Sequence, residues 1–148
     1  MADFRCVICT PTQKLFDEDV SYVNVPGYDG MFGVMAGHQL TVALTGGGGI
    51  CTITVDENSN EKREFLVFKG ASQMFNGILT VLAHFGIETK DIDPEKIAER
   101  KKEIQEIIDS TEGKDDTQSK TRRAIFRRQM EWQDFQLAYL DWKGNNAA

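Results

Sequence analysis

The stretch "ASQMFNGILTVLA", Ala71–Ala83, decides how this chain of 148 residues begins to fold. Two apolar segments flank Asn76-Gly77, a dipeptide that adopts two consecutive positive φ angles easily and therefore favours a two-residue hairpin turn. Because such a turn joins neighbouring antiparallel strands, the first part of the chain is expected to build an antiparallel sheet.

Further short extended segments surround this hairpin and are separated from one another by turn signals. They are "DFRCVICT", "VSYVNVPG", "LTVAL", "ICTITV" and "REFLVF", of which the last is expected to end at Lys69-Gly70. The stretch "GYDGMFGVMAGHQ" is instead interpreted as an irregular loop punctuated by glycine. Several short strands at this spacing predict an N-terminal antiparallel β-sandwich or barrel.

Four consecutive glycines in "LTGGGGICTIT", Leu44–Thr54, raise the question of a phosphate-binding loop. A Walker loop needs a lysine and then a serine or threonine after its last glycine, whereas Gly49 is followed by Ile50 and Cys51. The following residues alternate between apolar side chains and threonine, which is typical of a strand with one buried face. The glycines are therefore predicted to form a turn.

The hydrophobic period changes to that of a helix beyond the last strand. Asp93 is a good N-cap, the proline after it suits the first helical position, and isoleucines recur at helical spacing to about Asp109. A short polar link then leads to a second helix, Thr121–Trp142. The sequence thus predicts a β-sandwich over residues 1–87 and an antiparallel two-helix hairpin over residues 88–148.

The bulk composition limits the classes of partner. A net charge of −6 does not favour binding of nucleic acid or anionic lipid, and no apolar run approaches the length of about 20 residues that spans a bilayer. The beginning "MADFRCVICT" resembles neither a secretory signal nor a mitochondrial presequence, which favours a bacterial chain. Any membrane association is therefore expected to run through a partner protein.

The second helix carries two apolar stripes on nearly opposite sides, whereas a surface helix normally has one. Helix one can cover only one stripe, so the other is expected to lie on the sandwich or on a partner protein. Simple burial between helix one and the sandwich is the open alternative. One stripe consists of Ile125, Trp132, Phe135, Tyr139 and Trp142, and the other consists of Phe126, Met130, Leu137 and Leu140.

Four arginines form a local positive patch near the start of this helix, namely Arg122, Arg123, Arg127 and Arg128. They project around the helix instead of from one side, which does not suit a helix that fills a nucleic-acid groove. An acidic protein surface is the better target for them.

The Cys-x-x-Cys motif of Cys6 and Cys9 lies in an expected strand, where residues three apart point to opposite faces. The only histidines are His38 and His84, so a second pair of zinc ligands is missing. Packed cysteines are expected here, without a metal, and three cysteines suit a reducing compartment.

Three quoted stretches together resemble the epsilon subunit family of F-type ATP synthases, called delta in mitochondria. "TPTQKLFDEDVSYVNVPGYDGMFGVMAGHQLTVAL" is similar to the family's strand, Gly-x-x-Gly loop and Pro-Gly-His. "FLVFKGASQMFNGILTVLA" resembles its sheet-closing hairpin, and "DIDPEKIAERKKEI" falls where its first C-terminal helix begins. The resemblance covers nearly the whole chain.

This resemblance implies a non-catalytic rotor subunit of a proton-translocating ATP synthase, peripheral at the cytoplasmic face of the bacterial membrane. The sandwich would bind the gamma subunit and rest on the ring of c subunits. By position in the family, the residues that would meet the ring are Gly30, Met31, Phe32, Gly33 and His38.

The resemblance also implies that the hairpin lies against the sandwich or extends along gamma into the alpha/beta catalytic hexamer. In the extended form, the four arginines would face acidic segments of the beta subunits and block ATP hydrolysis. The partner-facing side of helix two would be formed by Trp132, Phe135, Tyr139 and Trp142.

The chain departs from the family at several positions. Ala36 replaces a proline, Met31 an acidic residue and Ala71 the second glycine of a pair. In the motif of ATP-binding members, Ile92 and Asp93 match, but Lys96 and Ile97 stand where arginine and alanine occur. A lysine cannot reproduce the donor fork of a guanidinium, which argues against ATP as a regulatory ligand and leaves no expected cofactor.

Two hypotheses from other classes remain open. The first is a free-standing ligand-binding sandwich with a helical lid. The second is a small thiol or histidine enzyme that uses Cys51, Cys6 or His38, although no nucleophile, base and orienting group stand in a recognisable arrangement.

Overall fold

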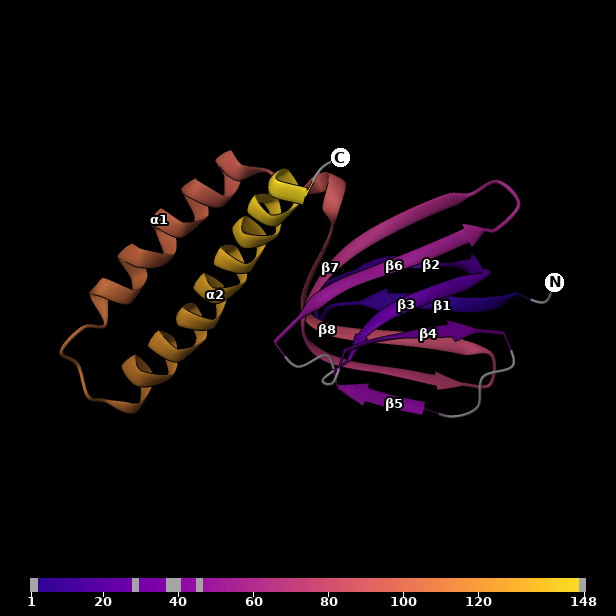
Figure 1. Ribbon diagram of the computed structural model, residues 1–148. Coiled ribbons are helices and arrows are strands. Elements are labelled where there is room, and N and C mark those ends of the chain that lie inside the picture. The colour runs from indigo at the N-terminus through magenta and orange to yellow at the C-terminus, as the bar shows by residue number, and fades with distance from the viewer. Residues whose placement is uncertain (1–2, 28–29, 37–40, 45–46, 147–148) are drawn as a thin grey trace. The chain divides into compact units, whose positions relative to one another are not determined.

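The computed structural model describes residues 3–27, 30–36, 41–44 and 47–146 (Figure 1). The chain divides into two compact units, residues 1–91 and 92–148, the first made of strands and the second of helices. The first unit extends beyond residue 87 because a short 3-10 helix follows its last strand.

Eight strands make up the first unit within the described residues. They are β1 (Phe4–Cys9), β2 (Lys14–Val20), β3 (Tyr22–Gly27), β4 (Gly30–Met35), β5 (Thr41–Leu44), β6 (Gly49–Asp56), β7 (Glu61–Phe75) and β8 (Ile78–Glu88). All their pairings are antiparallel except that of β1 with β8, which is parallel. The predicted antiparallel sandwich is thus confirmed apart from this one pair.

The hairpin β7–β8 has the predicted two-residue turn, with φ angles of 52° at Asn76 and 76° at Gly77. Its pairing keeps one register from Phe65, opposite Glu88, to Phe75, opposite Ile78. The prediction that a strand ends at Lys69-Gly70 is wrong, because β7 continues through both residues. Lys69 has a φ of 57°, so the local signal for a turn is real, but pairing with β8 carries the strand across it.

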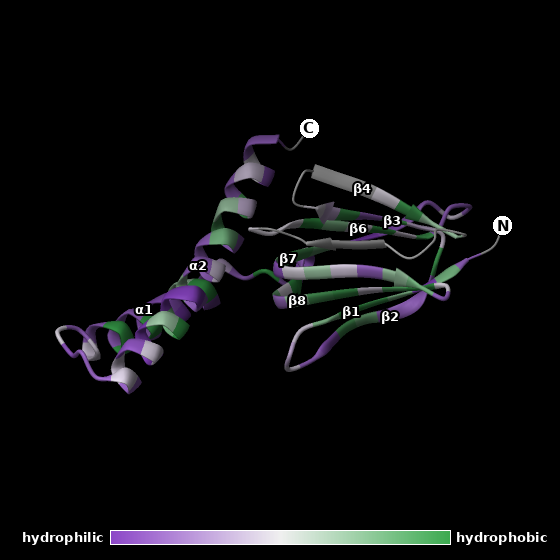
Figure 2. Cartoon of the chain, turned by 90° about the horizontal axis from the view of Figure 1, so that it is seen from below, coloured by the Kyte–Doolittle hydropathy of each residue, from purple (hydrophilic) through white to green (hydrophobic). Residues whose placement is uncertain are grey.

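This long hairpin is shared between the two layers of the sandwich (Figures 1 and 2). The first half of β7 pairs with β6, which continues to β3 and β4, whereas its second half pairs with β5. The first half of β8 pairs with β1, which continues to β2. The core therefore lies between the β6–β3–β4 side and the β5–β1–β2 side.

The core is built from alternate residues of these strands, as the period of two predicted for "DFRCVICT" and "ICTITV". Its side chains form one buried cluster: Phe4, Cys6, Ile8, Phe16, Val20, Val23, Val25, Val34, Cys51, Ile53, Phe65, Val67, Met74, Leu79, Val81 and Ala83. The four-glycine segment leads into the strand β6 and not into a helix, as the alternation after it predicted, and its first glycine lies outside the described residues.

The strand β2 was not predicted, and the expected single strand "VSYVNVPG" is divided at Ser21 between β2 and β3. The strand β2 was missed because its acidic residues 17–19 are poor strand formers, so the sequence gives no clear strand pattern there. Pairing with β1 places Arg5 beside this run, with its guanidinium 2.6 Å from the carboxylate of Asp17 and 3.5 Å from that of Asp19. Lys14 adds a third contact, 2.9 Å from Asp17.

An ion pair joins the neighbouring strands β7 and β8. Arg63 donates from Nε and Nη2 to both carboxylate oxygens of Glu88, at 2.8 and 2.7 Å, and Nη1 reaches Glu18 of β2 at 3.3 Å. The guanidinium also lies 5.1 Å from the ring centre of Phe16. These bonds lower the pKa of Glu88 and raise that of Arg63, so both groups hold their charges firmly.

The second unit consists of α1 (Pro94–Ser110) and α2 (Thr117–Asn146), which confirms the predicted helix pair. Asp93 is the N-cap of α1, and its carboxylate accepts the amide of Glu95 at 3.0 Å. The helix α2 begins four residues earlier than the predicted Thr121, since the Asp116 carboxylate accepts the amide of Ser119 at 3.0 Å and caps it there.

Candidate partner-binding surfaces

The described middle part of the expected glycine-punctuated loop is a strand, so that part of the prediction is wrong. Residues 30–35 form β4, which pairs with β3 along its whole length. Four of the five residues expected to meet a ring of c subunits, namely Gly30, Met31, Phe32 and Gly33, therefore lie in one strand, and His38 lies outside the described residues. Glycines are poor strand formers alone, which is why pairing had to decide this segment.

Gly33 has a packing reason of its own. A Cβ atom at this position would overlap with the phenol ring of Tyr22, which lies across the glycine from the neighbouring strand. The hydroxyl of Tyr22 also lies 3.2 Å from Oδ1 of Asn24, the residue opposite Gly33. An aromatic ring that covers a glycine in the neighbouring strand stabilises the pairing of the two strands, so Gly33 has a structural role within the sandwich. A contact of Gly33 with a partner protein stays a prediction. Met35 at the end of β4 is 52% exposed.

Three exposed apolar side chains of the sandwich lie together on the outside of the β7–β8 hairpin. Phe75, Ile78 and Leu82 are 52%, 43% and 55% exposed, and we call these three residues the outer strip. Ile78 and Leu82 share the outward face of β8, and Phe75 lies opposite Ile78 in the pairing. The sequence already indicated an exposed apolar face on this strand, because "ILTVLA" has apolar residues on both faces. The pattern alone does not tell which of the two faces is buried.

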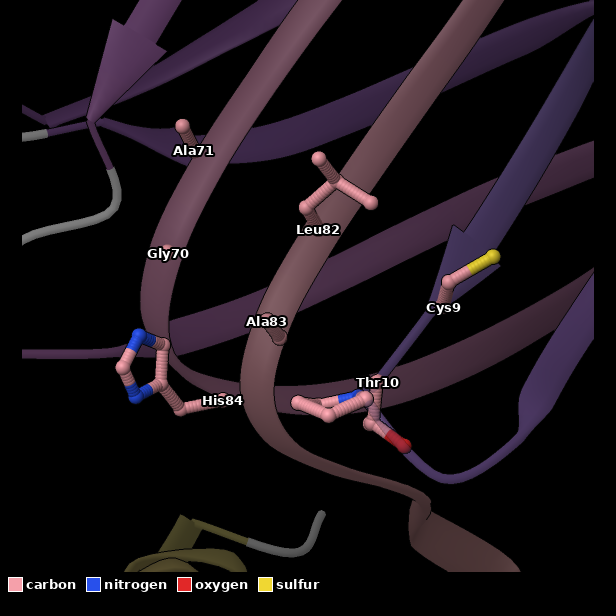
Figure 3. Close-up of a pocket in the computed structure, with 8 residues that line it drawn as sticks. Cys9, Thr10, Gly70, Ala71, Leu82, Ala83 and His84 are labelled. Atoms are coloured by element: carbon pink, nitrogen blue, oxygen red, sulfur yellow. The ribbon is translucent and has the colours of Figure 1, made fainter.

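A hollow of about 440 Å³ lies beside Leu82. Figure 3 shows Leu82 standing between Ala71 of β7 and Cys9 of β1, its two partners in the sheet. The lining residues are Cys9, Thr10, Pro11, Gly70, Ala71, Leu82, Ala83 and His84. The hollow thus continues the outer strip as a depression beside Leu82.

Polar contacts between the two helices fix which side of α2 faces α1. Arg100 donates to Oε1 of Gln129 at 2.8 Å, and Lys101 lies 2.6 Å from Oδ1 of Asp134. At 3.6 residues per turn, these contacts place α1 over one of the two predicted stripes. That stripe consists of Phe126, Met130, Leu137 and Leu140.

The aromatic stripe consequently lies on the side of α2 opposite α1. Its rings contact one another along the helix, with centres 6.4 Å apart for Trp132 and Phe135 and 6.1 Å apart for Tyr139 and Trp142. Ile125 and Trp142, near its two ends, are 46% and 51% exposed. Trp132 and Tyr139, between these ends, are buried and only 8% and 7% exposed, so the aromatic stripe is strongly exposed only near its ends and a partner contact along the whole stripe stays a prediction.

The four arginines do not act as one patch. Arg123 is engaged by the turn between the helices, where it donates to the carbonyl of Lys114 at 2.8 Å and also to Thr111. Arg122 lies 5.2 Å from the ring centre of Phe126. The remaining two, at positions 127 and 128, are exposed. A contact of these arginines with beta subunits stays a prediction.

The residues named for nucleotide binding have visible structural roles at the start of α1. Ile92 is buried, and the carboxylate of Asp93 is occupied in capping the helix. Lys96 is exposed and offers a single ammonium group. Among the described residues, no group of three or more histidine, cysteine or acidic side chains could hold a metal ion.

The thiols in the core are unsuited to nucleophilic chemistry. Burial raises the pKa of Cys6 to about 12 and raises the pKa of Cys51 as well. Only a thiolate is a good nucleophile, so both groups are unreactive near neutral pH. Cys9 lies half-buried on the other face of β1, as its spacing from Cys6 predicted.

Comparison with known proteins gives one consistent family. Residues 3–88 match the family model of the ATP synthase delta/epsilon chain β-sandwich domain. An ATP synthase epsilon chain from Rhodopseudomonas palustris is 35% identical over 98 residues, which cover 66% of this chain and 70% of the relative. An epsilon chain from another strain is 30% identical over 127 residues, or 86% of this chain and 87% of the relative.

A solved structure agrees at the level of the fold. A chain in the mitochondrial ATP synthase of Euglena gracilis superposes with a TM-score of 0.60 at 20% identity, covering 95% of this chain and 82% of that chain. Within the described residues, no helix is both long enough and apolar enough to cross a bilayer. On the family match and the sequence identity to curated epsilon chains, this chain belongs to the ATP synthase delta/epsilon chain family.

Proposed function

We propose that the chain is a non-catalytic rotor subunit of a proton-translocating F-type ATP synthase, part of the central stalk that joins gamma to the ring of c subunits. The observation that carries this proposal is the family match over the whole sandwich, residues 3–88. The similar Euglena chain comes from an assembly that contains a c-ring, which supports the same role. Association with the membrane surface would then run through the ring.

The outer strip is our candidate for the gamma-binding surface. Each of its three large apolar side chains is at least 43% exposed. Contiguous exposed apolar side chains mark protein interfaces, and gamma is the partner to which a central-stalk sandwich is joined. A protruding side chain of gamma in the adjacent hollow would fix the register of the two proteins.

Binding of gamma can be tested by co-purification. Leu82→Glu combined with Ile78→Glu places two charges in the outer strip and should abolish co-purification with gamma. The matched control is Thr54→Glu, a charge on a half-buried residue of β6 in the other layer. If the double variant is folded and binds gamma as well as the control does, the assignment of this surface is wrong.

The hairpin is proposed to restrain ATP hydrolysis by contacting the alpha/beta hexamer. The exposed Arg127 and Arg128 suit acidic segments of the beta subunits, because charge complementarity guides such contacts. The exposed Ile125 and Trp142 suit an apolar contact on the aromatic side of α2.

Hydrolysis by the reconstituted complex tests this restraint. Replacing Arg127 and Arg128 by glutamate should raise the rate of ATP hydrolysis, whereas Lys143→Glu, an exposed charge change near the end of α2, should not. Removal of residues 117–148 should raise the rate at least as much while the complex still assembles. An unchanged rate in both altered complexes would remove the inhibitory role and leave the rotor role intact.

ATP is not proposed as a ligand. The carboxylate of Asp93 already accepts the amide of Glu95, and Lys96 cannot grip phosphate oxygens with a planar fork. Calorimetric titration of the full chain with millimolar ATP should therefore give no binding heat. Saturable heat would favour the alternative of a nucleotide-responsive sandwich with a helical lid.

A further inference from the structure

The turn of the β7–β8 hairpin contains the only asparagine in the sequence that is followed by glycine, Asn76-Gly77. Both residues are exposed, and a Cβ added at Gly77 would meet no atom within 4 Å. A side-chain amide is attacked by the backbone nitrogen of the next residue most readily when that residue is glycine, because no side chain obstructs the approach. The turn therefore combines a reactive pair of residues with free access for water.

The groups that would react are not engaged elsewhere. Within the part of the chain that the structure describes, neither the side-chain amide of Asn76 nor the peptide group that joins it to Gly77 takes part in a hydrogen bond. The bond that ties the turn to β1 uses a different group, since the amide of Arg5 donates to the carbonyl of Gly77 at 2.9 Å. The peptide group between Asn76 and Gly77 can therefore rotate toward the Asn76 side chain without breaking a hydrogen bond.

The reaction that this arrangement allows needs only water. A hydroxide ion takes the proton of the Gly77 amide, the nitrogen bonds to Cγ of Asn76, and the bond from Cγ to Nδ2 breaks. The Nδ2 group takes a proton from water and leaves as ammonia, which leaves a cyclic imide. Water then opens the imide at Cγ, which gives aspartate, or at the main-chain carbonyl carbon, which gives isoaspartate. No atom changes its oxidation state.

We propose that Asn76 is a site of spontaneous deamidation, which places a carboxylate at the end of the outer strip. Two residues of the strip, Phe75 and Ile78, flank the turn. Arg5, opposite Ile78 on β1, already pairs with Asp17. The new charge thus enters a neutral face, because none of the outward residues of the hairpin beyond Gly70 is ionisable. These residues are Ala71, Gln73, Phe75, Ile78, Thr80 and Leu82.

The two products differ in their effect on the fold. Aspartate followed by glycine suits the same two-residue turn, so this product keeps the hairpin. Isoaspartate instead carries the main chain through Cβ and Cγ, which lengthens the turn by one carbon atom. The lengthened turn cannot keep both the pairing of Phe75 with Ile78 and the bond from Arg5 to Gly77. The isoaspartate form is therefore less stable than the aspartate form.

Peptide mapping by mass spectrometry after incubation of the folded full chain in mildly alkaline buffer tests the reaction. Asn60 is a matched internal control, because it is also exposed and has a φ of 59°, but it is followed by glutamate. Conversion at Asn76 should be faster by roughly tenfold or more, because glycine leaves the attacking nitrogen unobstructed. Conversion at Asn76 that is no faster than at Asn60 would overturn the proposal.

The products can be separated by ion exchange and compared with the Asn76→Asp variant. In urea unfolding, the isoaspartate fraction should unfold at a lower concentration than this variant, which should match wild type. Equal unfolding of the two products would overturn the structural account of the turn.

The effect of the new charge on binding rests on the gamma surface proposed above. Asn76→Asp should weaken co-purification with gamma severalfold, whereas Asn60→Asp, which adds a charge at the turn between β6 and β7, should not. Unchanged binding by Asn76→Asp, while the double variant Ile78→Glu, Leu82→Glu no longer binds, would overturn this effect and leave the gamma surface intact. Binding by the double variant would refute the gamma surface itself, and the effect on binding with it, whereas the mapping of Asn76 involves no gamma.

Discussion

Replacing Glu88 by glutamine gives a quantitative test of how the sandwich is held together. Glutamine keeps the size of the side chain but removes the charge and one of the two oxygens that Arg63 grips. The Glu88 side chain is 11% exposed and that of Arg63 29%, so the guanidinium left behind remains partly removed from water. Its other contacts, to Glu18 and to the ring of Phe16, persist.

The expected loss lies between two limits. Exposed ion pairs contribute about 0.2 to 1 kcal/mol, whereas leaving one fully buried charge without its partner costs roughly 3 to 5 kcal/mol. Since this pair is half-buried and Arg63 keeps Glu18, we expect a loss of about 1.5 kcal/mol. For a domain of this size, that loss lowers the melting temperature by roughly 6 to 12 °C.

The loss must also depend on pH with a definite sign. Arg63 lowers the pKa of Glu88 below its ordinary value of 4.5, so the folded state holds this carboxylate ionised more readily than the unfolded state does. Its contribution is therefore fully present above about pH 4.5 and is lost as the pH falls through the lowered pKa of the folded state. The stability difference between wild type and variant should shrink in acid.

Urea unfolding followed by far-UV circular dichroism, at neutral pH and in acid, measures this difference. The control is Glu57→Gln in the turn between β6 and β7, where the carboxylate is exposed. A Glu88→Gln variant as stable as this control at neutral pH would refute the reasoning. A stability difference of the same size in strong acid would refute it too, because it would show that charge is not the cause.

Three further outcomes are expected. Gly70→Ala should destabilise the sandwich by roughly 3 kcal/mol or more, measured by urea unfolding, because a Cβ there would overlap with a carbonyl oxygen of β8. Ile104→Ala should cost about 3 kcal/mol of hairpin stability, since Ile104 is fully buried, and tryptophan fluorescence can follow it because both tryptophans lie in α2. Thiol titration of the native protein should detect Cys9 alone within minutes, because the raised pKa values of Cys6 and Cys51 and their burial block reaction until the protein unfolds.

Local chemistry in the sequence was sufficient for several elements. The turn at Asn76-Gly77 and the cap at Asp93 each depend on residues a few positions apart, so both could be predicted and are confirmed. The alternation in β1 and β6 fixed which side chains enter the core, because a strand places alternate residues on opposite faces. The antiparallel helix pair followed from periodicity and from a short link.

Contacts between distant residues decided the rest. Pairing with β3 makes a strand of the glycine-rich β4, pairing with β8 carries β7 across Gly70, and Arg5 from β1 makes the acidic β2 acceptable. The sequence showed two apolar stripes on α2, but only its contacts with α1 assign the aromatic stripe to the opposite side. Likewise, the sequence does not distinguish the four arginines of α2 from one another. The structure does, because Arg123 donates a hydrogen bond to the carbonyl of Lys114 in the turn between the helices. Composition and spacing show which conformations and contacts are open to a residue. The residues that it meets in the folded chain decide which of these conformations has the lowest free energy.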